Sequence, residues 1–469
     1  MRSVRRLAAL LLVSLLLLVV GCQQKAQKPA VSPTSSPTTS PTASSTTSAS
    51  NFVMGTGIYP DNDPPVPAKA ARFSDPSFST PLQRITDKKD GYLGPGIENE
   101  YSKMDPANSD GTLLMLRGNT AAYYLYDPVK CKLLRKVSAF DECEFTEPEP
   151  RWSRADPKLF YYICDTELRG YDTSTNESTV IHDFKKEFPT AAYVTTRSEG
   201  DASLDRRYWC CFMVEGKGDK LMGVICFDRD ENQVVGHKSG GFPDSLNWVG
   251  MSMSGQWCII GYEDKAIYTQ VFSRDFQTTV KLPEGSAGHG DAALTAGGRD
   301  VYVYQNVRND YICMADMATG AETRLVHIPF EVNPDIGMHV SGNCAATPGW
   351  ALISTYGAEE APPDKTHSWM DNQLFMLELS EAPGSGGSPT RSPTRRRARP
   401  VRRIIMRRPS RRWTPAAPGC SGVRTGAISR RTIQTRTRRC CPPAGSRRCR
   451  NSSVTEGGAA VSGGSSSFF

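Results

Sequence analysis

Hydrophobic residues between positions 110 and 380 gather in short runs, and a tight-turn pair stands in front of each run. Successive turn pairs lie 43–51 residues apart, and helical periodicity is nearly absent. Short apolar runs bounded by turn residues predict β-strands. The six turn-plus-strand units are Asp110-Gly111 before Leu113–Leu116, Asp156-Pro157 before Leu159–Tyr162, Asp205-Arg206 before Tyr208–Cys211, Ser254-Gly255 before Trp257–Ile260, Gly297-Gly298 before Val301–Tyr304, and Pro348-Gly349 before Trp350–Ile353.

A second apolar run follows each of these units and usually ends in a polar residue. The clear copies are Tyr123–Asp127, Leu168–Asp172, Val224–Asp228 and Tyr311–Asp316, and the weaker ones are Ile267–Ser273 and Leu374–Glu378. Several strands per unit at a period near 45 residues are typical of β-propeller blades. We therefore expect an all-β protein whose residues 55–382 form a propeller of six recognisable four-stranded blades. The alternative is an irregular β-sandwich in which the turns recur by chance.

Three segments carry a resemblance to known propellers. They are Arg151-Trp152-Ser153 with the strand unit that follows it, Gln83-Arg84-Ile85-Thr86-Asp87, and Gly349–Ser354. These resemble blade motifs of the TolB-like and oligogalacturonate-lyase-like propellers, over about residues 80–380. Blade motifs specify a fold far better than a chemistry.

The first 22 residues resemble the export signal of a bacterial lipoprotein. A basic start, Met1–Arg6, precedes an apolar run, Leu7–Val20, that is too short to span a bilayer comfortably. Val19-Val20-Gly21-Cys22 resembles a lipobox, which implies cleavage after residue 21 and lipidation of Cys22. The alternative is an ordinary secretory signal with an incidental cysteine. We expect a lipid-anchored protein of the cell envelope, at the outer membrane or cell surface.

Two segments flanking the propeller have compositions that cannot form a core. Residues 22–54 are rich in Ser, Thr and Pro and predict an extended tether. Residues 383–469 predict a disordered, Arg-rich tail, with 20 Arg and no acidic residue between Arg391 and Arg450. This tail has the bias of a GC-rich gene read in the wrong frame, so we hypothesise a frameshift near residue 385 that destroyed a seventh blade of the intact ancestor. The alternative is a genuine basic tail that binds nucleic acid, anionic glycans or lipid headgroups.

The net charge of +7 hides an acidic body. Without those 20 arginines, residues 1–390 hold 36 basic and 48 acidic residues, a balance of about −12 that does not favour nucleic acid. The body also has nine cysteines, an odd number, so at least one is unpaired. We expect most of them to be small buried hydrophobic residues. The absence of a CxxC pair argues against a zinc site.

Two histidines stand at equivalent places in successive blades. His289 lies eight residues before Gly297-Gly298, and His339 lies nine before Pro348-Gly349. The pair Asn247-Trp248 holds the corresponding place in the preceding blade. Such positions start the innermost strand, so we expect their side chains to meet at one mouth of the central channel. With Asp291, the two imidazoles are candidate ligands for Mn²⁺ or another divalent metal.

The resemblance to oligogalacturonate lyases implies a Mn²⁺ held by histidines at such a mouth, but the match is in location alone. The closely spaced His and Gln ligands of that family are absent, a third ligand would have to come from the lost blade, and no arginine is identified as the base. The alternative is that both histidines hydrogen-bond across blade turns. The sequence also lacks the GxSxG, Walker and HExxH motifs.

These observations predict a membrane-anchored propeller outside the cytoplasm that binds a peptide, glycan or protein partner at its channel mouth, without catalysis. Two alternatives stay open. One is a metal-dependent polysaccharide lyase of the oligogalacturonate type, and the other is an envelope scaffold with a TolB-like role.

Overall fold

The computed structural model describes residues 53–59, 66–87, 89–90, 97–118, 122–216, 220–242, 245–264, 268–356 and 368–380, with two short strands at 402–403 and 406–407. The chain divides into two units, Met1–Ser50 and Asn51–Phe469, and all described residues belong to the second. The export signal, Cys22, most of the tether and the predicted frameshift lie outside the described residues. No helix among the described residues is long and apolar enough to cross a membrane.

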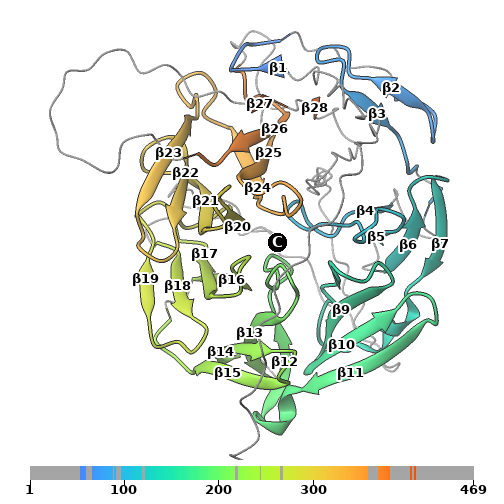
Figure 1. The fold of residues 1–469 in the computed structure, drawn as a ribbon, viewed down its shortest axis with the longest axis vertical. Coiled ribbons are helices and arrows are strands. Elements are labelled where there is room, and N and C mark those ends of the chain that lie inside the picture. Colours follow the sequence, from blue (N-terminus) through green and yellow to red (C-terminus); the bar gives the residue numbers. More distant parts are fainter. Residues whose placement is uncertain are drawn as a thin grey trace, which may run out of the picture. The chain divides into compact units, whose positions relative to one another are not determined.

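Six four-stranded antiparallel sheets form a propeller ring (Figure 1). Blade 1 consists of β4 (Ile97–Glu98), β5 (Leu114–Gly118), β6 (Tyr123–Asp127) and β7 (Lys132–Lys136). Blade 2 consists of β8 (Arg151–Trp152), β9 (Leu159–Cys164), β10 (Glu167–Asp172) and β11 (Glu177–Asp183). Blade 3 consists of β12 (Ala191–Thr195), β13 (Tyr208–Glu215), β14 (Lys220–Asp228) and β15 (Gln233–Lys238).

The second half of the ring repeats this pattern. Blade 4 consists of β16 (Leu246–Met251), β17 (Trp257–Tyr262), β18 (Gln270–Ser273) and β19 (Thr279–Lys281). Blade 5 consists of β20 (Gly290–Leu294), β21 (Asp300–Asn306), β22 (Tyr311–Asp316) and β23 (Glu322–His327). Blade 6 consists of β24 (Gly337–Ser341), β25 (Trp350–Tyr356), β26 (Gln373–Glu378) and β28 (Met406–Arg407). The propeller predicted from the sequence is confirmed, although the weak run at 267–273 forms a strand only from Gln270.

Apolar side chains between neighbouring sheets hold the blades together. Tyr161 and Ile163 of β9, for example, pack with Trp209 of β13 and Phe227 of β14 in one buried cluster. Both faces of a central strand are covered in this way, so these strands read as continuous apolar runs. The first strand of each sheet is left with one side toward the centre of the ring, where β16, β20 and β24 lie closest in Figure 1.

A hairpin from the N-terminal part of the chain lies between blade 6 and blade 1 (Figure 1). Its strands are β2 (Arg72–Ser74) and β3 (Pro81–Gln83), which pair with each other. Phe78, in the turn, is buried in the cluster that holds Ile353 of blade 6. On the other side, the Tyr126 hydroxyl of blade 1 donates to the carbonyl oxygen of Ile85. The chain before blade 1 therefore bridges the two end blades of the described ring, a role that the sequence did not reveal.

The hairpin is accompanied by a second short pairing, in which β1 (Val53–Met54) pairs with β27 (Arg402–Arg403). Two short segments of the predicted tail, β27 and β28, thus carry strand pairings, and the rest of the tail lies outside the described residues.

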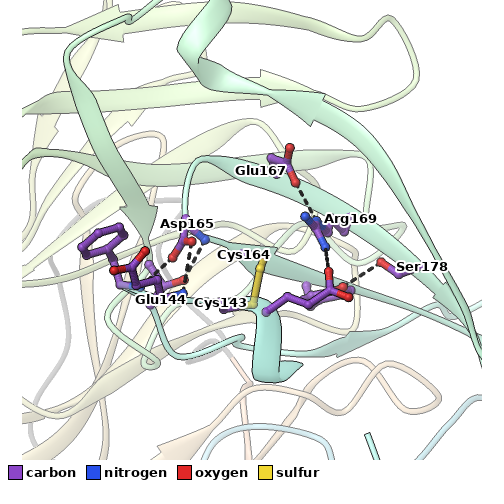
Figure 2. Close-up of a disulfide and its surroundings, with 11 residues drawn as sticks. Cys143, Glu144, Cys164, Asp165, Glu167, Arg169 and Ser178 are labelled. Carbon is purple, nitrogen blue, oxygen red and sulfur yellow. Dashed lines mark hydrogen bonds and ion pairs between the residues drawn. A yellow bond between two sulfur atoms is a disulfide. The ribbon is translucent and has the colours of Figure 1, made fainter. Parts of the chain in front are cut away.

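Two disulfides occur among the nine cysteines of the body. Cys143–Cys164 ties the 3-10 turn η1 (Ser138–Glu142) to β9 (Figure 2), and Cys210–Cys258 joins β13 of blade 3 to β17 of blade 4. The five remaining body cysteines match the expectation of small buried residues. They are Cys131, Cys211, Cys226, Cys313 and Cys344.

Candidate functional site

The innermost strand of blade 1 is interrupted at the centre of the ring. β4 pairs with β5 through Ile97 and Glu98, and pairing resumes at Ala107, which faces Leu114. Residues 99–105, the plug, leave the sheet between these points. The plug reaches blade 5 through Lys103, whose Nζ donates to the Gly290 carbonyl oxygen at 3.1 Å. It reaches blade 6 because Asn343 Nδ2 donates to the Lys103 carbonyl oxygen at 2.7 Å.

Lys103 places a buried cation among the inner strands. Its ammonium lies 3.9 Å from the centre of the Trp248 ring on β16 and 3.5 Å from Glu199 Oε2 in the segment after β12. The side chain is only 4% exposed, so these contacts have to replace its lost hydration. A carbonyl, an indole face and a carboxylate together do so. Lys103 therefore connects blade 1 to blades 3, 4 and 5.

A network of buried arginine and carboxyl side chains holds the other side of the plug. Arg151 Nη1 lies 2.7 Å from Glu100 Oε2, and Arg151 Nε lies 3.4 Å from Asp201 Oδ1. Arg206 Nη1 lies 2.7 Å from the same Asp201 oxygen. Burial alone would raise the pKa of Asp201, but Arg206 and Arg151 outweigh it and hold the pKa below its usual value.

Four ring side chains meet beside the plug, and we call them the mouth cluster: Tyr101, His289, His339 and Tyr356. The His339 ring centre lies 4.8 Å from that of His289, 5.5 Å from that of Tyr101 and 5.1 Å from that of Tyr356. His289 is exposed, and the other three are half-buried. Burial raises the pKa of Tyr101, and the neighbouring Glu199 and Tyr356 raise it further. This phenol thus stays protonated and can donate a hydrogen bond.

The predicted pair of histidines is therefore brought together, but Asp291 has a different environment. Its Oδ2 accepts a hydrogen bond from the Gly342 backbone N–H at 2.9 Å, so this carboxylate helps to join β20 to blade 6. Burial raises the pKa of Asp291 to about 7, although nearby Lys103 opposes the shift.

A metal does not fit these residues as a three-ligand set. Within the described part of the chain, no three His, Cys, Asp or Glu side chains are grouped so that they could hold a metal ion. His289 and His339 offer one imidazole each, and the Asp291 carboxylate accepts a hydrogen bond from the Gly342 backbone of blade 6.

The other predicted channel residues take separate places. Trp248 is buried, stacks on Tyr302 with ring centres 6.3 Å apart, and supports Lys103. The Asn247 carbonyl oxygen accepts from Arg197 Nη1 at 3.3 Å. No motif in the sequence marked Tyr101, Lys103, Glu199 or Tyr356. Tyr101 and Lys103 lie in a segment that leaves its own sheet, which the blade repeat does not mark, whereas Glu199 follows β12 and Tyr356 ends β25.

Comparisons with known proteins return the same kind of fold. No family model matches the sequence, and no curated protein matches it significantly. Among solved structures, an oligogalacturonate lyase in complex with manganese is 14% identical, covering 70% of this chain and 83% of its own, with a TM-score of 0.47. An oligogalacturonate lyase from Vibrio parahaemolyticus is 14% identical, covering 70% and 84%, with a TM-score of 0.44.

A putative TolB from Agrobacterium tumefaciens is also similar, at 12% identity, covering 47% of this chain and 79% of its own, with a TM-score of 0.32. The resemblance stated from the blade motifs is thus found again among solved structures. The propeller assignment itself rests on the sheet topology of this chain.

Proposed function

We propose that this protein is an exported, lipid-anchored propeller that binds an oligosaccharide at the mouth cluster. The observation that carries the proposal is the convergence of one imidazole and two phenols on His339, each with its ring centre within 5.5 Å of that of His339. Such rings offer apolar faces for the C–H side of a sugar and polar edges for its hydroxyl groups. Ligand sites are commonly aromatic surfaces with a few fixed polar groups.

The plug supports this proposal because it gives the cluster a rigid base. Arg151 holds the plug by a hydrogen bond to Glu100, and Lys103 donates to a carbonyl oxygen of blade 5, so Tyr101 between them has little freedom. A preformed surface loses less conformational entropy when a ligand binds.

Export is supported by two independent features. One is the lipobox-like sequence that ends at Cys22. The other is the pair of disulfides in the body, because disulfides persist mainly in oxidising compartments. Replacing Cys22 with Ala should move the protein from the membrane fraction to the soluble extracytoplasmic fraction. Unchanged membrane retention of this variant would contradict lipid anchoring.

Binding is tested by calorimetric titration of the full chain with trigalacturonate, cellotriose and chitotriose at pH 6. We expect at least one of them to bind, and His289→Ala and His339→Ala each to weaken binding about tenfold, the equivalent of about 1.4 kcal/mol for a lost ring contact. The matched control is His327→Ala. That imidazole also packs edge-on against a tyrosine, Tyr311, at 5.2 Å, but it lies on the outermost strand of blade 5.

Failure to bind any of the three, or equal binding by wild type and both mouth variants, would contradict the oligosaccharide proposal. A peptide or envelope protein whose binding is lost in the same two variants would show that the mouth is the site but that the ligand class, or a scaffold role, is different.

A further inference from the structure

Glu100 is the one plug carboxylate that contacts Arg151, and its side chain is 6% exposed. Its Oε2 lies 2.7 Å from Arg151 Nη1, whereas its Oε1 is buried without a hydrogen-bond partner among the described residues. A buried carboxylate oxygen without a donor is costly while the group is ionised. A proton on Oε1 removes this cost.

Arg151 contacts other acceptors besides Glu100. Arg151 Nε lies 3.4 Å from Asp201, and its Nη2 donates to the Gly200 carbonyl oxygen at 2.9 Å. Arg151 Nη1 also donates to the Pro150 carbonyl oxygen at 3.0 Å. Arg206 is bound to Asp201 in the same way and adds no free cation to the network. The guanidinium is thus shared among several acceptors, which leaves Glu100 incompletely compensated.

Further negative charge faces Glu100 from blade 2. Glu149 is buried, and its negative charge raises the pKa of Glu100. Thr195, Thr196 and Ser198 of blade 3 donate hydrogen bonds to the Glu149 carboxylate. Glu147 also raises the pKa of Glu100, and its own cation partner is Arg117 of β5.

On the blade 1 side, burial raises the pKa of the Tyr123 phenol, and the nearby Glu100 carboxylate raises it further. This phenol can donate a hydrogen bond but supplies no positive charge at neutral pH. Arg151 contacts Glu100 Oε2 and leaves Oε1 without a donor among the described residues. A proton is therefore the cation that the geometry accommodates.

We propose that Glu100 is a proton-controlled latch: it carries a proton while the plug is seated, and its ionisation loosens the plug and withdraws Tyr101 from the mouth cluster. When the latch opens, the carboxylic acid gives its proton to solvent water and the carboxylate regains hydration. Tyr101 follows Glu100 directly in the chain and contacts His339, so plug and mouth move together. The consequence for ligand binding rests on the proposed function; the movement of the plug does not.

The size of the effect follows from linkage. Burial raises the pKa of Glu100 from 4.5 to about 7 despite the opposing Arg151. The seated state therefore holds the proton more tightly than the open state and is favoured at low pH. Between pH 6 and pH 8 the opening equilibrium should increase about tenfold.

Hydrogen exchange of the full chain, followed by mass spectrometry and corrected for the intrinsic rate, measures this equilibrium without any ligand. Protection of residues 99–105 should fall about tenfold from pH 6 to pH 8 in the wild type. Glu100→Gln mimics the neutral acid, so its protection should stay the same at both pH values. The matched control is Glu215→Gln, an exposed glutamate that pairs with Lys220, and it should behave like the wild type.

Equal protection of the wild-type plug at pH 6 and pH 8 would overturn the latch, whether or not Glu100→Gln folds. So would a folded Glu100→Gln variant that keeps the full pH dependence. A loss of protection in the wild type with no oligosaccharide binding at either pH would confirm the latch and overturn the proposed function. Binding of one of the three oligosaccharides by a protein whose plug protection does not change with pH would confirm the proposed function and overturn the latch.

Discussion

The buried ammonium of Lys103 gives the most specific test of how the ring is held at its centre. Lys103→Met keeps most of the side-chain stem and removes the charge. The Gly290 carbonyl oxygen then loses a donor, Glu199 loses its cation partner, and Asp291 loses a nearby positive charge. Removing one partner of a buried ion pair costs about 3–5 kcal/mol. Because Glu199 is 19% exposed and regains some hydration, we expect about 3 kcal/mol, the low end of this range.

Urea unfolding at pH 8, followed by circular dichroism, measures this loss as a lower midpoint. The loss should be smaller at pH 5, where Asp291 is protonated in the folded protein because its pKa is about 7. Lys103→Arg, which keeps the charge, is the control for a change in shape. Adding Glu199→Gln to Lys103→Met should recover part of the lost stability. A Lys103→Met midpoint equal to that of the wild type at pH 8 would refute the reasoning.

Three further predictions concern the rest of the fold. Phe78→Ala should destabilise the protein by about 3–5 kcal/mol, because the ring is buried against blade 6, and an unchanged urea midpoint would show that the hairpin does not help to close the ring. Burial raises the pKa of Glu100 and of Asp291 to about 7, so the folded state holds their protons more tightly than the unfolded chain. The stability that these two protons contribute is complete below the unfolded pKa values and is lost as the pH rises through 7. The urea midpoint should therefore be higher at pH 5 than at pH 8. A lower midpoint at pH 5 would contradict these pKa shifts. Cys143→Ser with Cys164→Ser removes a cross-link between residues 21 apart, which should cost about 3 kcal/mol, and a smaller change than about 1 kcal/mol would mean that η1 stays in place without the bond.

The repeat of turns and apolar runs was enough to predict the blades. A residue pair such as Asp156-Pro157 marks the entry to β9, and the central strands are apolar on both faces because neighbouring sheets cover them. The same repeat placed His289 and His339 in contact, since equal distances from equivalent turns give equivalent places in adjacent blades. The repeat also relates the two cysteines of one disulfide, because Cys210 and Cys258 are 48 residues apart, the length of one repeat, and so occupy nearly equivalent places in adjacent blades.

The plug and the ring closure could not be predicted in this way. Residues 99–105 leave the sheet of blade 1, and their partners are far away in the chain, such as Gly290 for Lys103. The strands β2 and β3 have three residues each, too few to show an alternating pattern. The role of Asp291 depends on the backbone N–H of Gly342 in the next blade, a contact that residue types alone do not indicate.

The central claim is that ligand binds at the mouth cluster beside the plug. Hydrogen exchange of the full chain at pH 6, with and without a saturating concentration of the oligosaccharide that binds, tests it most directly. We expect slower exchange in residues 99–105 and in β24, which carries His339, and no change in the outermost strand β23. Protection confined to outer strands, with none in the plug or β24, would contradict the account.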